Sequence, residues 1–178
     1  MKTNIALIGF MGTGKTAVGR LLAEKLGRRF IELDSVIEKK AGKSIPEIFV
    51  EDGEIAFREL EIKATKEVAR TKRAVIACGG GVVLNRINID HLKEGAVVVH
   101  LTAPPGVILK RTLREAGKRP LLNVENPLAA IRELLKFRKP LYERAADTTI
   151  NTAKLDINAV AEQIIDELKE DESYNFKK

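Results

Sequence analysis

The chain has 178 residues, of which 44% are hydrophobic and 31% are charged, so it is long enough for one domain with a substantial core. This composition excludes a disordered tail, a collagen-like fibre and a repeat array, and no apolar run reaches the roughly 20 residues that span a bilayer. The net charge of +6 suggests a phosphate-bearing partner, and the single cysteine, Cys78, cannot form an internal disulfide, which favours a reducing cytoplasm.

The first half of the chain alternates between short apolar runs and amphipathic stretches. In chain order, we expect a strand at 3–9, a helix at 15–26, a strand at 29–33, a helix at 34–41, a short helix opening at 44, a helix at 53–70 and a strand at 74–78. The short helix is predicted from a capping box, in which Ser44 is followed three residues later by Glu47.

The second half continues the alternation, and its last residues, 173–178, are expected to form a frayed tail. In chain order, we expect a loop with a short helix at 82–93, a strand at 96–101, helices at 106–116 and 128–144, a weak strand at 148–151 and a helix at 156–169. Strands separated by helices are typical of βαβ units. We therefore expect a single α/β domain with three α/β/α layers, a parallel sheet, and ligands beyond the carboxyl ends of its strands.

A glycine-rich segment between the first strand and the first helix carries the strongest functional signal. It reads GFMGTGKT at 9–16 and fits the P-loop pattern G-x-x-x-x-G-K-[ST], in which glycines let backbone N–H groups converge on phosphate oxygens. Lys15 is expected to reach the β- and γ-phosphates of a nucleotide, and Thr16 to place its hydroxyl on Mg²⁺. The residues expected to bind the nucleotide here are Gly12, Thr13, Gly14, Lys15, Thr16 and Ala17.

The same segment also satisfies a rival pattern. A dinucleotide-binding fingerprint, G-x-G-x-x-A, can be placed at 12–17, with Glu32 where a ribose-binding acid would lie. Two residues separate the strand end from the first fingerprint glycine, which makes the loop too long for that site. The lysine–threonine pair has no role in a dinucleotide site, so we favour the P-loop.

Further candidate residues follow the second and third strands, at the edge where the P-loop is expected. Glu32 and Asp34 could hold a metal or accept a hydroxyl proton, although Asp34 could equally serve as the N-cap of the next helix. The triplet Gly79, Gly80 and Gly81 exposes backbone N–H groups and lets a ligand approach closely, or it is simply a flexible turn.

Arginines supply much of the positive charge. Residues 110–144 contain ten basic and four acidic residues, which alone gives +6. Arg111 and Arg119 flank a short loop, and a mobile arginine-bearing loop suits phosphoryl transfer. Arg138 on the next helix could clamp a carboxylate. Arg58 is spaced to pair with the carboxylate three residues later. Taken alone, each of these arginines is more often an ordinary surface residue.

Taken in order, these segments resemble the shikimate kinase family, small P-loop enzymes similar to nucleoside monophosphate kinases. The resemblance extends from residue 5 to about 168. It rests on GFMGTGKT at 9–16, FIELD at 30–34, GEIAFRELE at 53–61, GGG at 79–81, RT and RPLL within 111–122, and RKPLY at 138–142.

The resemblance implies a five-stranded parallel sheet in the order 2-3-1-4-5, with a substrate-binding region at about 34–61 and a lid at about 112–124. It implies transfer of the γ-phosphoryl group of ATP, with Mg²⁺, to the 3-hydroxyl of shikimate. That reaction lies on the route to chorismate and the aromatic amino acids.

By matched position, the resemblance also assigns roles to individual side chains. Lys15, Asp34 and Arg119 would be catalytic: Asp34 would hold the substrate hydroxyls and orient or deprotonate the attacking one, and Arg119 would be the lid arginine that reaches phosphate and substrate. Arg111 would stack on adenine. The residues that would bind the substrate or line its site are Asp34, Arg58, Glu61, Gly79, Gly80, Gly81 and Arg138, with Glu61 supporting Arg58 and the two arginines binding the carboxylate.

The chain departs from the family pattern at two places. Glu32 stands where the family has an aspartate, and we expect it to serve Mg²⁺ through water. The segment 151–155 lacks the usual arginine–proline pattern, and Lys154 stands in for the arginine, so the adenine contacts there stay open.

Other protein classes share some of these features. Gluconokinases and nucleotide kinases share the P-loop and lid, but two arginines suit a carboxylate and fit nucleotide bases poorly, and the glycine triplet with the helix at 53–61 distinguishes shikimate from gluconate. A non-catalytic nucleotide-binding regulator and a basic RNA-binding module belong to different classes; only eight aromatic residues argue against the second. We expect a cytoplasmic monomer that binds ATP and shikimate and has no nucleic-acid or membrane partner.

Overall fold

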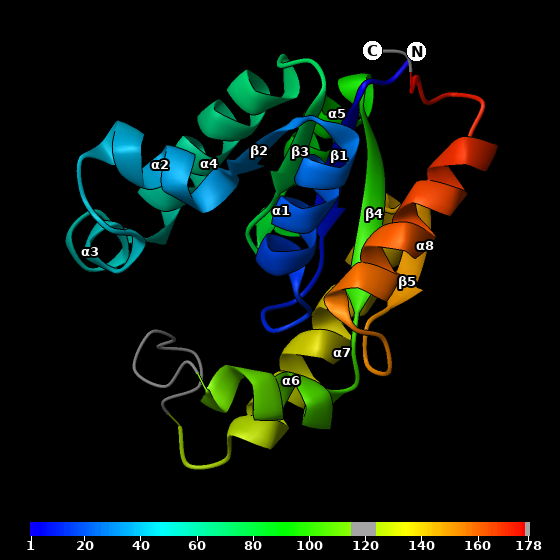
Figure 1. The fold of residues 1–178 in the computed structure, drawn as a ribbon. Helices are drawn as coiled ribbons and strands as arrows, with labels where there is room; N and C mark the ends of the chain where they lie inside the picture. The colour runs from blue at the N-terminus through cyan, green and yellow to red at the C-terminus, as the bar shows by residue number, and fades with distance from the viewer. Residues whose placement is uncertain (115–123, 177–178) are drawn as a thin grey trace.

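The structure is a computed structural model that describes residues 1–114 and 124–176. Its centre is a five-stranded sheet in the order β2-β3-β1-β4-β5, which agrees with the order that the resemblance implies (Figure 1). Every neighbouring pair of strands runs parallel, as expected for strands joined through helices. The strands are β1 (Asn4–Ile8), β2 (Arg29–Glu32), β3 (Ala74–Ala77), β4 (Ala96–Thr102) and β5 (Thr148–Asn151).

Most helices lie within one or two residues of their predicted bounds. The capping box is confirmed: the Ser44 N–H donates to Glu47 Oε2 over 2.7 Å, and the Glu47 N–H donates back to Ser44 Oγ over 3.4 Å. The helices among the described residues are α1 (Lys15–Leu26), α2 (Leu33–Ala41), α3 (Ile45–Glu51), α4 (Gly53–Ala69), α5 (Arg86–Gly95), α6 (Pro105–Leu113), α7 (Pro127–Ala145) and α8 (Ile157–Glu170), with a 3-10 turn η1 (Val82–Leu84).

The sequence predicts a loop with a short helix at 82–93. The chain there forms η1 and then α5, a helix of ten residues. Asn85 is the N-cap of α5, because its side chain accepts a hydrogen bond of 3.1 Å from the Ile87 N–H. This cap gives α5 a defined start, and Leu92 then anchors the helix in the core.

Helices cover both faces of the sheet (Figure 1). Along β1, Ile5 and Leu7 belong to the core cluster that includes α1 and α8, whereas Ala6 and Ile8 belong to the cluster that includes α4, α5 and α7. A strand that is buried on both faces does not need to alternate apolar with polar residues. This explains the wholly apolar run at 5–8. Within the described part of the chain, no helix is both long and apolar enough to cross a bilayer.

The parallel arrangement brings five strand ends to one edge of the sheet. β1 leads into the P-loop, β2 into α2, β3 into the glycine triplet, β4 into α6, and β5 into the segment before α8. This is the edge at which open parallel sheets bind their ligands.

The expectation of a frayed tail at 173–178 is wrong for its described part. Tyr174 forms a parallel bridge with Lys2, and the Asn175 N–H donates to the Lys2 carbonyl over 2.9 Å. The Arg28 guanidinium lies 4.9 Å from the centre of the Tyr174 ring, and the ring is buried against the cluster of α1 and α8. Tyr174 lies in a short polar stretch without a helical or strand-like pattern of apolar residues, so the sequence pattern could not reveal this docking.

Tyr174 offers a test of how much the docked segment stabilises the fold. Tyr174→Ala is expected to lower the free energy of unfolding by about 3 kcal/mol, because it removes a buried ring. Tyr174→Phe should leave that free energy unchanged or raise it, since the buried hydroxyl has no hydrogen-bond partner in the described part of the chain. Urea denaturation would measure both, with Phe137→Ala on the exposed surface of α7 as control. An unchanged Tyr174→Ala variant would contradict the docking.

Candidate active site

The P-loop turns sharply between β1 and α1, and the turn depends on glycine. Gly12 has φ of 73° and Gly14, the N-cap of α1, has φ of 97°, a region that favours glycine. A Cβ on Gly12 would lie 3.3 Å from the Ile108 carbonyl oxygen and 3.0 Å from Thr112 Cγ2. The loop therefore packs closely against α6 at Gly12, and at Gly14 the positive φ alone favours glycine.

Side chains of the P-loop itself hold its carbonyl groups. The Lys15 ammonium donates to the carbonyls of Gly9 and Phe10 over 2.8 and 2.9 Å, and Thr13 Oγ1 donates to the Phe10 carbonyl over 2.8 Å. The amino end of α1, with the positive end of its dipole, faces the adjoining cavity. Such a loop is suited to phosphate.

A cavity of about 1100 Å³ opens beside the P-loop, between α1, α6 and the segment before α8. Its volume is large enough for a nucleotide. Its basic side chains are Lys15, Arg20, Arg111 and Arg114, so the cavity favours an anionic ligand. The six P-loop residues that the sequence predicts to bind the nucleotide, from Gly12 to Ala17, all line it, as does Arg111.

Thr16 and Glu32 meet at the cavity edge. Thr16 Oγ1 donates to Glu32 Oε1 over 2.7 Å, and Arg20 Nη2 lies 3.7 Å from Glu32 Oε2. Hydroxyl and carboxylate oxygens are ligands that Mg²⁺ accepts when phosphate oxygens and waters supply the rest. The two residues therefore fit the ion that the sequence assigned to them.

Arg111 joins the P-loop to the segment after β5. Its Nη1 donates to the Gly12 carbonyl over 3.2 Å and to Thr152 Oγ1 over 2.9 Å, and its Nη2 donates to the Thr152 carbonyl over 2.7 Å. Thr152 Oγ1 also lies 3.0 Å from the Thr13 carbonyl oxygen, which it can bond. Thr152 was not predicted as a site residue, and Lys154, which was considered for the adenine contact, is exposed.

The glycine triplet lies against three of the predicted substrate residues, one for each glycine. A Cβ on Gly79 would lie 2.6 Å from an oxygen of Asp34, and a Cβ on Gly81 would lie 2.6 Å from Arg58 Nη1. A Cβ on Gly80 would lie 3.7 Å from Arg138 Nη1. The turn therefore leaves no room for a side chain at Gly79 or Gly81, and it lies beside three side chains that the sequence predicts for the substrate site.

Arg58 is held by carboxylates on its own helix. Its Nη1 donates to Glu61 Oε2 over 3.0 Å, and its Nη2 donates to Glu54 Oε1 over 3.2 Å. Glu61 is 1% exposed. Burial raises the pKa of the Glu61 carboxyl, although Arg58 and a hydrogen bond from Asn88 act to lower it. The predicted Arg58–Glu61 pair is therefore present and largely buried.

Arg138 and Tyr142 lie one turn apart on α7 and share an acceptor. Arg138 Nη1 donates to the Gly80 carbonyl over 3.4 Å, and the Tyr142 hydroxyl donates to the same oxygen. His100 stacks on Tyr142 with ring centres 4.9 Å apart. Burial lowers the pKa of His100 to about 4, so the ring is neutral near pH 7 and adds no charge to the site.

Comparison with known proteins assigns this geometry to a family. A family model for shikimate kinase matches residues 11–169. The chain belongs to the shikimate kinase family. The shikimate kinase of Thermodesulfovibrio yellowstonii is 52% identical over 164 residues, which cover 92% of this chain and 94% of that protein.

Solved structures of shikimate kinases share the fold. The shikimate kinase from Acinetobacter baumannii in complex with shikimate aligns with a TM-score of 0.89 and 43% identity, covering 95% of this chain and 94% of that one. The shikimate kinase from Aquifex aeolicus aligns with a TM-score of 0.78 and 32% identity, covering 93% of this chain and 96% of that one. The sequence resemblance is thus confirmed at the level of family and fold.

One predicted catalytic residue, Arg119, lies outside the described residues, as does most of the predicted lid at 112–124. Cys78 is described and buried, and burial raises the pKa of its thiol to about 12, so it is no nucleophile near neutral pH. Among the described residues, the predicted site therefore consists of the P-loop and the side chains around the glycine triplet.

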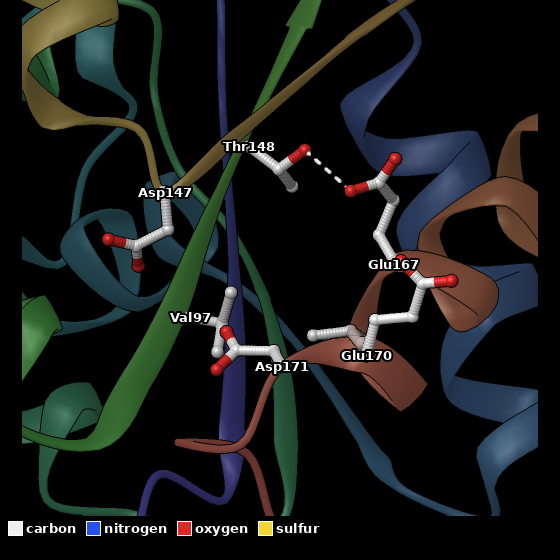
Figure 2. A pocket seen from close by; sticks show the side chains of 7 residues that line it. Val97, Asp147, Thr148, Glu167, Glu170 and Asp171 are labelled. Carbon is white, nitrogen blue, oxygen red and sulfur yellow. Dashed lines mark hydrogen bonds between the residues drawn. The ribbon is translucent and has the colours of Figure 1, made fainter.

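A smaller cavity of about 250 Å³ lies toward the opposite edge of the sheet, between β4, β5 and the end of α8 (Figure 2). Its lining is mostly acidic: Val97, Asp147, Thr148, Glu167, Leu168, Glu170 and Asp171. Thr148 Oγ1 donates to Glu167 over 3.2 Å. The carboxylates make this cavity unsuitable for phosphate, so it is not the nucleotide site.

Asp147 links this smaller cavity to the sheet. Its Oδ2 accepts hydrogen bonds from the Val98 N–H over 2.8 Å and from Lys2 Nζ over 3.1 Å, and Lys93 Nζ lies 3.5 Å from Oδ1. Burial alone would raise the pKa of the Asp147 carboxyl, but these partners together lower it below its usual value.

Asp147 should make stability depend on pH. A carboxyl with a lowered folded-state pKa stabilises the fold above its unfolded pKa of about 3.9, and this stabilisation is lost as the pH falls through the folded value. Asp147→Asn is expected to reduce the free energy of unfolding by about 1 kcal/mol at pH 7, with the difference shrinking below pH 4. Urea denaturation from pH 3 to 7 would measure it, with Glu170→Gln as control. A difference that grows on acidification would contradict the assignment.

Proposed function

We propose that this protein transfers the γ-phosphoryl group of ATP to the 3-hydroxyl of shikimate, giving shikimate 3-phosphate and ADP, with Mg²⁺ as cofactor. The reaction is a step in chorismate and aromatic amino acid biosynthesis. Membership of the shikimate kinase family supports the reaction, and the curated relatives are named shikimate kinases. The roles of the site residues are part of this proposal.

One observation carries the proposal: the phosphate loop and the glycine triplet lie next to each other. A Cβ on Gly80 would lie 3.7 Å from the Gly9 carbonyl oxygen and 3.7 Å from the Met11 nitrogen. The loop that suits phosphate therefore lies directly beside the glycine triplet. An acid and two arginines surround that triplet. A phosphoryl donor on one side would meet an anionic acceptor on the other without a separate substrate domain.

The side chains around the triplet match the chemistry of shikimate. Arg58 and Arg138 approach it from different helices, and two guanidinium groups can bind one carboxylate by charge-assisted hydrogen bonds. Asp34 beside Gly79 offers an acceptor for ring hydroxyls. A nucleotide base has no carboxylate that the arginines could bind, so this site fits a nucleotide kinase less well than a shikimate kinase.

In the reaction, the 3-hydroxyl oxygen attacks the γ-phosphorus as the bond from that phosphorus to the β–γ bridging oxygen breaks. The hydroxyl proton passes to Asp34 or to water, and ADP leaves. A loose transition state asks mainly for alignment and charge neutralisation, which Lys15 and the amino end of α1 supply. Thr16 and Glu32 would hold Mg²⁺, which when bound would neutralise charge on the phosphate oxygens.

The remaining expectations are part of the same proposal. Arg119, assigned by resemblance alone, would contact phosphate and substrate from the lid. The enzyme would act as a monomer in the cytoplasm, where its buried free Cys78 stays reduced, and without a nucleic-acid partner. Light scattering after size exclusion would test the monomer.

A coupled ADP-release assay tests the reaction. Wild-type protein with ATP and Mg²⁺ should release ADP with shikimate, and much less with gluconate or nucleoside monophosphates. Lys15→Ala should reduce kcat by at least about 100-fold, because it removes a charge aimed at the transferred phosphoryl group. No ADP release with shikimate at millimolar concentration would overturn the proposal.

Arg138 tests the carboxylate clamp. Arg138→Ala should raise the KM for shikimate by about 10- to 100-fold, because a charge-assisted hydrogen bond to the substrate is lost. The KM for ATP should change little. Arg132→Ala removes an exposed arginine from the same helix and should change neither constant. If both variants behaved alike, Arg138 would not be the clamp.

A further inference from the structure

Behind Arg58 and Glu61 lies a buried polar residue for which the reaction described above has no use. Asn88 is in α5, is 0% exposed, and does not line the nucleotide cavity. Its Nδ2 donates to Glu61 Oε2 over 3.4 Å and to the Val82 carbonyl over 3.2 Å. Both amide hydrogens are therefore directed at oxygen atoms.

The orientation of this amide follows from its partners. Reversed, the amide would set its own oxygen against a carboxylate and a carbonyl, which offer no hydrogen. In the orientation present, Asn88 Oδ1 is buried without a hydrogen-bond partner in the described part of the chain. An unpaired buried acceptor costs about 1–3 kcal/mol, so stability alone does not account for an asparagine here.

The hydrogen bonds of Asn88 complete a closed ring of hydrogen-bonded residues on the substrate side of the site, formed by Arg58, Glu61, Asn88, Val82 and Gly81. Arg58 donates to Glu61, and Asn88 donates to Glu61 and to Val82. Val82 directly follows Gly81, whose carbonyl oxygen lies 3.5 Å from Arg58 Nη1. The ring thus ties the guanidinium on α4 to the glycine turn after β3 through a side chain from a third element, α5.

We propose that Asn88 is a positioning residue for shikimate binding, whose amide holds the Glu61 carboxylate, and through it the Arg58 guanidinium, in register with the glycine triplet. The inference rests on the proposed function. Without the two amide hydrogens, the Glu61 carboxylate has one donor fewer and the Val82 carbonyl has none from this side chain. The Arg58 guanidinium can then turn away from the glycine triplet toward the exposed Glu54 carboxylate.

The proposal predicts a selective change in kinetics. Asn88→Leu, similar in size but without donors, should raise the KM for shikimate by about tenfold, leave the KM for ATP within about twofold, and change kcat little. Asn88→Ser, which can keep one donor, should fall between wild type and Asn88→Leu. If Asn88→Leu is poorly folded by urea denaturation, Asn88→Ser alone carries the test.

Asn85 provides a matched control on the same helix. Asn85→Ala removes the N-cap of α5 and should lower the free energy of unfolding by about 1 kcal/mol, but it breaks no bond of the ring. Both KM values should stay at the wild-type level. A merely structural role for α5 would instead change the KM for shikimate in Asn85→Ala as well.

The outcomes separate this inference from the function on which it rests. Wild-type protein that fails to phosphorylate shikimate overturns the proposed function. An active wild type whose Asn88 variants keep the KM for shikimate overturns the positioning role alone. Equal increases in the KM for shikimate and for ATP, or a loss confined to kcat, would also overturn it, since the ring contacts only the shikimate side.

Discussion

The parallel pairing of β1 with β3 is the constraint on which the site depends. Leu7 pairs with Ala77, and the Cys78 N–H donates to the Leu7 carbonyl over 3.0 Å, immediately before the two strands leave the sheet. The P-loop and the glycine triplet therefore begin side by side. A register shift of one residue would turn every side chain of β3 to the opposite face and separate the two loops, so the buried faces of both strands also fix the active site.

Close to this edge of the sheet, the chain buries polar groups that a core selected only for stability would lack. Glu61 is buried although burial raises its pKa, and Asn88 Oδ1 and His100 Nδ1 are buried without partners in the described part of the chain. These groups lie behind or beside the arginines of the substrate side. Functional sites commonly break local rules of packing, and these three groups do so beside one site.

The sequence predicted what depends on local pattern and missed what depends on distant contacts. Periodicity and capping signals gave nearly all the elements, and the P-loop and triplet gave the edge of the site. Thr152 and Asn88 could not be found this way, because a threonine after a strand or an asparagine within a helix becomes significant only when another segment approaches it. Tyr174 was missed for the same reason: its partners lie at the other end of the chain.

The basic charge of the chain also takes a specific form at the site. Arg111 and Arg138 are held by carbonyl oxygens, and in the described ranges no carboxylate forms an ion pair with either. A carbonyl fixes the direction of a guanidinium but does not cancel its charge, so both arginines keep their attraction for an anion. Arg58 differs, because Glu54 and Glu61 already offset its charge. Under the proposed function, Arg138 would therefore supply most of the positive field at the substrate carboxylate, and Arg58 would supply mainly a fixed geometry.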